Sequence, residues 1–239
     1  MLFRSRGDRM KKVNSVLLSL VLLLILPAVL FAGGAKEAPA VTKDTLIVAM
    51  AAEPSTLDGN GKNDNASINV RRQLYETLLT YNEDMELVPL LAESYRWEGD
   101  KVIIFNIRKG VLFHNGEELK ASDVKYSVER AARMMYASNQ VGVVDLPACQ
   151  VLDDYTYKMV LKMPFAPMLA NVTVSAMAIV HEKTTKELND DMTERPVGNG
   201  PYKMDVWNRG ERIERSDEHT SELQSRINTR HAVYRRNNK

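Results

Sequence analysis

Residues 91–133 read LAESYRWEGDKVIIFNIRKGVLFHNGEELKASDVKYSVERAAR, and this stretch decides the fold of the chain. Two runs of strand-forming residues, 93–98 and 101–108, flank the turn residues Gly99-Asp100, a pattern that predicts an antiparallel hairpin. Within the second run, Ile103, Phe105 and Ile107 alternate with their neighbours at the two-residue period of a β-strand.

The second half of the stretch predicts a turn and then a helix. Asn115-Gly116 is a turn signal, and Ser122-Asp123 opens a segment whose apolar residues recur at helical spacing. Those apolar residues are Val124, Val128, Ala131 and Met135. The side chain of Lys120 cannot accept hydrogen bonds from the first turn of the helix. We therefore expect Ser122 to be the N-cap, so that the helix starts about two residues later than it would with a cap at position 120.

The flanking segments add further helices and strands. Upstream, residues 44–51 (DTLIVAMA) predict a buried strand and residues 65–80 predict an amphipathic helix. Downstream, strands are predicted at 151–162 (with a turn at Asp153-Asp154), 177–180 and 202–207, and short helices at 168–172 and 184–188. Because no strict βαβ repeat is visible, the chain is predicted to have an α/β fold of the mixed, α+β kind.

The N-terminal segment has the three parts of a secretory signal peptide. Lys11 and Lys12 follow Met10, residues 16–26 form an apolar core, and a small-residue cleavage site precedes Gly33. We therefore predict a signal peptide at 10–32, a linker at 33–43 and a periplasmic mature protein. A membrane anchor is the alternative, but the apolar stretch is at the short limit for spanning a bilayer and contains a proline. No cysteine lies near the cleavage site, so we expect no lipid anchor.

Both ends of the chain look foreign to the rest. Residues 215–225 read RSDEHTSELQS and differ only at Asp217 from the peptide that a common sequencing adapter encodes. Residues 1–5 match the translation of the other adapter end. We therefore expect residues 215–239 to be translated adapter and disordered, and residues 1–9 to be a non-native leader. A genuine basic polar tail is the alternative at the C-terminus.

Charge and motif content argue against several classes of protein. Residues 33–214 carry 21 Lys or Arg against 27 Asp or Glu, so we expect no nucleic-acid partner. Cys149 is the only cysteine and is expected to be buried and inert. The sequence has no phosphate loop, dinucleotide fingerprint or zinc-type spacing, so we predict no enzyme, no cofactor and no metal site. His114 and His181 are expected to be surface or turn residues.

Together with three further blocks, residues 91–133 closely resemble the signature of the extracellular solute-binding proteins of family 5, the peptide- and nickel-binding receptors of ABC importers. The further blocks are residues 44–58, 75–94 and VGNGPYKM at 197–204. The resemblance implies a periplasmic-binding-protein-like fold of two lobes that close over a ligand. Family members are longer, so residues 44–214 would hold only the N-terminal lobe and an extra subdomain at about 62–180.

The resemblance also implies a ligand site and a function. The expected ligand-binding residues are Glu53, Pro54, Ser55, Thr56 and Leu57, with the Glu53 carboxylate pairing with a ligand amine. A capped turn without a ligand role is the alternative. The implied function is the binding component of an ABC importer, a monomer that captures short peptides and delivers them to the permease subunits. Receptors for nickel chelates or oligosaccharides, a signalling sensor and a secreted hydrolase remain as alternatives.

Overall fold

The computed structural model describes residues 46–217. The chain separates into two compact units between Ala49 and Met50, and all of the described helices and strands belong to the second. The predicted signal peptide, the linker at 33–43, the leader and residues 218–239 lie outside the described residues. Residues 215–217 belong to a strand, so the expected disorder is wrong for these three, and their adapter origin stays a prediction. No helix among residues 46–217 is long and apolar enough to cross a membrane.

The described helices and strands are mixed along the chain, as predicted. The α-helices are α2 (Asn65–Leu74), α3 (Ala121–Arg133), α4 (Met168–Asn171) and α5 (Glu182–Glu187). The strands are β1 (Leu79–Tyr81), β2 (Leu87–Pro89), β3 (Ala92–Glu98), β4 (Val102–Ile107), β5 (Gln150–Asp153), β6 (Thr156–Val160), β7 (Tyr202–Asn208) and β8 (Arg212–Asp217). Short 3-10 turns cover Ser138–Gln140, Leu146–Ala148 and Ser175–Met177.

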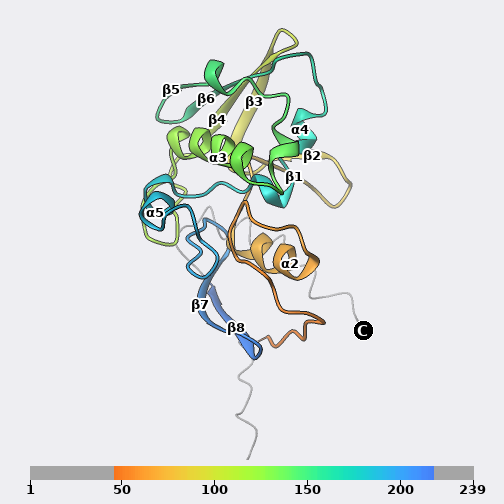
Figure 1. Cartoon of the computed structure of the whole chain (residues 1–239). Helices are drawn as coiled ribbons and strands as arrows, with labels where there is room; N and C mark the ends of the chain where they lie inside the picture. Colours follow the sequence, from red (N-terminus) through yellow and green to blue (C-terminus); the bar gives the residue numbers. More distant parts are fainter. Residues whose placement is uncertain (1–45, 218–239) are drawn as a thin grey trace, which may run out of the picture. The chain divides into compact units, whose positions relative to one another are not determined.

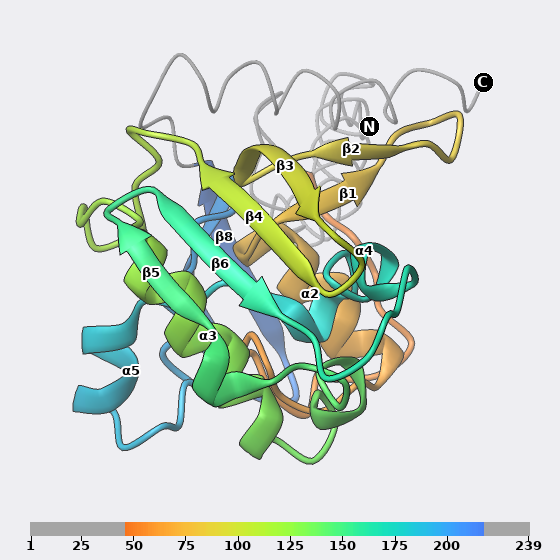
Figure 2. The same ribbon diagram turned by 90° about the horizontal axis from the view of Figure 1, so that it is seen from above.

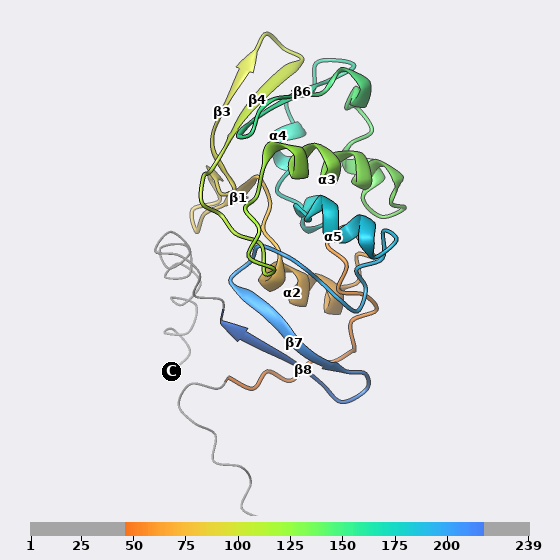
Figure 3. The same ribbon diagram turned by 90° about the vertical axis from the view of Figure 1, so that its left-hand side faces the viewer.

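A four-stranded antiparallel sheet, in the order β3-β4-β6-β5, forms the centre of the molecule's larger core. The predicted hairpin is confirmed, because β3 and β4 pair around Gly99, which has a φ of 68°. On β4, Ile103 and Phe105 are fully buried, and they lie beside Met159 and Tyr157 of β6 on the same face of the sheet. Helix α3 packs against this face (Figures 2 and 3). Alternation along the strands therefore places one face in the core.

The buried apolar residues divide into two cores. The first contains the central sheet and α3 and is built from residues between Leu78 and Ile179. The second contains α2 and the hairpin β7-β8, with Leu57 and Met192 (Figure 1). The predicted subdomain boundary near residue 62 falls before α2, whereas the packing divides the chain after Tyr75, because α2 belongs to the second core.

Helix α2 ends at Leu74, six residues earlier than predicted. A loop from residues 198–201 lies against this end of the helix, where Gly200 N donates to the Leu74 carbonyl oxygen at 2.9 Å. The Asn199 side chain accepts a hydrogen bond from the backbone N of Glu76 at 3.0 Å. A Cβ added to Gly198 would lie 1.8 Å from the Leu74 carbonyl oxygen, so only glycine fits there. Tertiary contacts therefore replace the hydrogen bonds that would extend the helix.

Two predicted strands are absent from the described residues. Residues 46–50 of the predicted strand 44–51 have no strand partner and are exposed, Ile47 by 75%, because a strand needs a neighbour to satisfy its backbone groups. Residues 177–180 are buried but join no sheet. Ile179 N donates one hydrogen bond to the Glu76 carbonyl oxygen.

The start of α3 also differs from the prediction. The helix begins at Ala121 with Lys120 as its N-cap, so the expected shift to Ser122 is wrong. The Asp123 carboxylate accepts a hydrogen bond from the backbone N of Lys120 at 2.9 Å, while Asp123 N donates to the Lys120 carbonyl oxygen at 3.1 Å, so this end is fixed without a cap from the Lys120 side chain. Met135 lies beyond the end of the helix and is 79% exposed, while the other three predicted apolar residues are buried.

Candidate functional site

The predicted ligand loop, Glu53–Leu57, precedes α2 in the chain and contributes Leu57 to the second core. Pro54, Thr56 and Leu57 are buried, and Glu53 and Ser55 are exposed. Leu57 N donates to the carbonyl oxygen of Thr193 at 3.1 Å, which ties the loop to the chain segment that follows α5. The loop therefore presents two polar side chains from a backbone that is held in place.

Helix α2 holds the middle of the ligand loop. The Ser67 hydroxyl oxygen accepts hydrogen bonds from the backbone N of Ser55 and of Thr56, at 3.0 and 3.2 Å. The Ser55 hydroxyl donates to Asp64, the N-cap of α2, at 2.5 Å. Burial raises the pKa of Asp64, but hydrogen bonds from Ser55 and Ser67 outweigh it and lower the pKa to about 2. Ser55 is thus engaged in capping, as the alternative of a capped turn requires.

The Glu53 carboxylate points to the hairpin β7-β8 rather than standing alone. Its Oε1 accepts hydrogen bonds from Trp207 Nε1 at 3.1 Å and from Gly210 N at 2.9 Å. The guanidinium of Arg209 lies 3.9 Å from the centre of the Trp207 ring and forms an ion pair with Glu194 at 3.3 Å. An open hollow of about 340 Å³ is lined by residues of this region, including Trp207, Arg209 and Glu194.

Sequence reasoning missed Trp207 and Arg209 as neighbours of the ligand loop. The only available signal was an aromatic and a basic residue a few positions after the VGNGPY block, which does not indicate a partner 154 residues away. An amine that paired with Glu53 would share the carboxylate with Trp207 and Gly210, because both already donate to Oε1.

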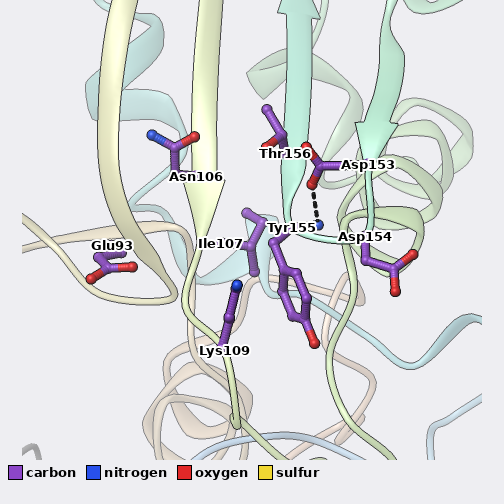
Figure 4. Close-up of a pocket in the computed structure, with 8 residues that line it drawn as sticks. All are labelled: Glu93, Asn106, Ile107, Lys109, Asp153, Asp154, Tyr155 and Thr156. Carbon is purple, nitrogen blue, oxygen red and sulfur yellow. Dashed lines mark hydrogen bonds between the residues drawn. The ribbon is translucent and has the colours of Figure 1, made fainter.

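A larger open hollow of about 600 Å³ lies at one end of the central sheet, and no ligand-loop residue lines it (Figure 4). Its charged lining residues are Glu93, Lys109, Asp153 and Asp154. Asp153 accepts a hydrogen bond from Tyr155 N at 2.8 Å across the turn between β5 and β6, and this bond lowers the pKa of its carboxyl group. The predicted turn at Asp153-Asp154 is confirmed: Asp153 bonds within the turn, and the Asp154 carboxylate lies 3.8 Å from Lys120 Nζ.

The two histidines among residues 46–217 were expected to be surface or turn residues. His114 lies in a turn, but both are buried, so neither is a surface residue. His114 Nδ1 accepts a hydrogen bond from Gly198 N at 3.3 Å, and its Nε2 is 3.0 Å from the Gly200 carbonyl oxygen, to which it donates. His181 is the N-cap of α5, where it accepts from Thr184 N at 3.3 Å. Cys149 is buried, as predicted, and burial raises the pKa of its thiol.

Comparison with known proteins identifies the family. Residues 86–218, more than half of the chain, match the bacterial extracellular solute-binding proteins, family 5 middle region. The chain belongs to this family. A curated relative, the glutathione-binding protein GsiB of Salmonella choleraesuis, is 28% identical over 172 residues, which are 71% of this chain and 34% of that protein. The chain thus spans about a third of the length of the curated relatives it matches.

Solved structures of the same class share the fold. The periplasmic binding protein DppA of Helicobacter pylori, in complex with the peptide STSA, is 29% identical with a TM-score of 0.64, over 71% of this chain and 38% of that chain. The binding protein AgaA of A. tumefaciens, in complex with agropinic acid, is also 29% identical with a TM-score of 0.65, over 69% and 34%. The described residues therefore form part of a periplasmic-binding-protein fold.

Proposed function

We propose that this chain is the N-terminal part of the extracytoplasmic binding component of an ABC importer, a monomeric receptor that captures short peptides and delivers them to the permease. Membership of the solute-binding family supports the receptor role. The ligands of GsiB and of the solved DppA complex support the cargo, because glutathione is a tripeptide and STSA a tetrapeptide. Within this chain, the observation that carries the proposal is the rigidly held loop that presents the Glu53 carboxylate beside Trp207.

The chemistry of the site formed by Glu53 and Trp207 suits the amino end of a peptide. A carboxylate that already accepts two hydrogen bonds through Oε1 is fixed in orientation, so a ligand ammonium would meet a preorganised acceptor. The half-buried indole of Trp207 adds apolar area next to it, and the Arg209 guanidinium lies over one face of the ring. The rest of the cleft would come from the second lobe, which closes over the ligand.

The test is equilibrium binding of a library of di- to tetrapeptides to the full-length receptor, by which we mean this chain continued through its genomic reading frame. Glu53→Gln is expected to weaken binding of peptides with a free amino terminus about tenfold, which is 1.4 kcal/mol, and to leave N-acetylated peptides unchanged. Glu83→Gln, an exposed acid in the turn between β1 and β2 and outside the second core, is the control for the loss of one negative charge. If no peptide of the library binds, the proposal that the receptor takes short peptides is wrong.

A second candidate cargo is a small non-peptide solute. AgaA, with the same fold and 29% identity, was solved with agropinic acid, so this architecture accepts ligands other than peptides. Nickel chelates and oligosaccharides belong to this group of alternatives. Binding that requires added nickel–histidine complex, or that occurs with sugars and not with peptides, would favour it.

A further inference from the structure

Asp58, directly after the ligand loop, forms a buried ion pair with Arg130 of α3. Arg130 Nη1 donates to Asp58 Oδ1 and Nη2 donates to Oδ2, both at 2.7 Å. The two side chains are 1% and 4% exposed. Such a fork-to-fork pair fixes both the distance and the orientation of its partners, because two parallel hydrogen bonds leave the carboxylate little freedom to rotate.

The same pair also holds the chain segment that follows α5. Met192 N donates to Asp58 Oδ2 at 3.2 Å, and Arg130 Nη2 donates to the carbonyl oxygen of Asp190 at 2.6 Å. Asp190 has a φ of 61°, in the left-handed region that few non-glycine residues adopt. The next hydrogen bond along, from Leu57 N to Thr193 O, belongs to the ligand loop itself.

The ligand loop is thus fixed at both ends by residues that it does not contain. At its start, Trp207 and Gly210 hold the Glu53 carboxylate. At its end, Asp58 is held by Arg130, and the Asp58 backbone N donates to the Thr56 hydroxyl oxygen at 3.0 Å. Because Asp58 directly follows Leu57, a shift of the Asp58 carboxylate would also displace the backbone of the ligand loop.

We propose that the Arg130–Asp58 pair is the positioning element of the ligand loop: it sets the affinity for the solute without touching the solute. The proposal rests on the proposed function and extends it to a helix of the first core. It also gives the end of the signature YSVER, residues 126–130, a physical role. On the same face of α3, Ser127 accepts a hydrogen bond from Val180 N at 2.9 Å, so α3 also holds the segment by which the chain returns to the second core.

The experiment compares Arg130→Lys with wild type in the full-length receptor. Lysine keeps the charge and loses the planar fork, so the ion pair survives and the fixed orientation does not. Hydrogen exchange, followed by mass spectrometry, reports the amides of residues 55–60, and equilibrium titration reports the affinity for the tightest peptide of the library. Asp58→Asn is the second variant, in case the first folds poorly. Ile103→Val in β4 is the control, because it weakens the first core, to which no ligand-loop residue belongs.

We expect Arg130→Lys to speed exchange of the loop amides and to weaken peptide binding by about tenfold or more at a temperature where the sheet amides stay protected. Ile103→Val should change neither. Faster loop exchange with unchanged affinity would overturn the proposal, as would an equal loss of affinity in Ile103→Val matched for melting temperature. If the wild type binds no peptide, the proposed cargo is wrong. The positioning role is then tested by the exchange of the loop amides alone, and unchanged exchange in both variants would overturn it.

Discussion

Replacing Glu76 with glutamine should stabilise the protein, and increasingly so as the pH rises. Glu76 follows the end of α2, with 6% of the residue exposed, and neither carboxylate oxygen has a hydrogen-bond partner among the described residues. Burial raises the pKa of the carboxyl group from 4.5 to about 8, and the charge of Arg108 opposes this shift only in part. The backbone of Glu76 is well bonded, so the side chain is held where it is.

The size of the effect follows from the two pKa values. Between pH 4.5 and about 8, the folded protein keeps a proton that the unfolded chain has lost, so stability falls as the pH rises through this window. One pKa unit corresponds to about 1.4 kcal/mol, which gives a penalty of about 3 kcal/mol at pH 7 and about 5 kcal/mol once both states are ionised. Glutamine has the shape of the protonated carboxyl group and carries no charge at any of these pH values.

The assay is urea unfolding of the full-length receptor and of Glu76→Gln from pH 5 to pH 9. The stability gained by the variant should grow by about 1.4 kcal/mol per pH unit up to pH 8 and then level off. Glu83→Gln, at an exposed position in the turn between β1 and β2, controls for loss of one surface charge and should give a small difference without this slope. A gain that does not depend on pH would refute the reasoning.

Three further predictions concern packing. Gly198→Ala should destabilise the receptor by about 3 kcal/mol or more in urea unfolding, because its Cβ would meet the Leu74 carbonyl oxygen, whereas Gly142→Ala, with no atom nearer than 3.9 Å, should not. Cys149 should react with a thiol-specific disulfide reagent only after unfolding, and reaction of the native protein at the rate of a free thiol would contradict its burial. Residues 33–214 alone should lack a cooperative thermal transition, and observing one would show that this part folds independently.

The parts of the fold that sequence reasoning predicted correctly are those fixed by local pattern. The hairpin β3-β4 follows from alternation on both sides of Gly99, and α3 follows from the spacing of Val124, Val128 and Ala131. The wrong start of α3 has a local cause, the bond from Lys120 N to Asp123, but two other failures of the sequence prediction have distant causes. The end of α2 depends on a loop 123 residues further along the chain, and a run of apolar residues becomes a strand only if a partner strand is present.

In the candidate site, too, local features could be predicted and contacts between distant residues could not. The ligand loop could be located by its polar and turn-forming residues and by resemblance, since those are features of contiguous sequence. The contact between Glu53 and Trp207 spans 154 residues, and the pair between Asp58 and Arg130 spans 72. No periodicity links residues so far apart, so their meeting required the folded chain.

The two segments that connect the cores lie next to each other. Ile179 N bonds to the Glu76 carbonyl oxygen, and the Asn60 side chain donates to the carbonyl oxygens of Ala176 and Ala178 at 2.8 and 3.1 Å. The roughly one hundred residues between Glu76 and Ile179 therefore start and finish at one place, in the manner of a domain inserted into another. An insertion with adjoining ends can be lengthened, shortened or exchanged for another without separating the two points of the host chain to which it is joined.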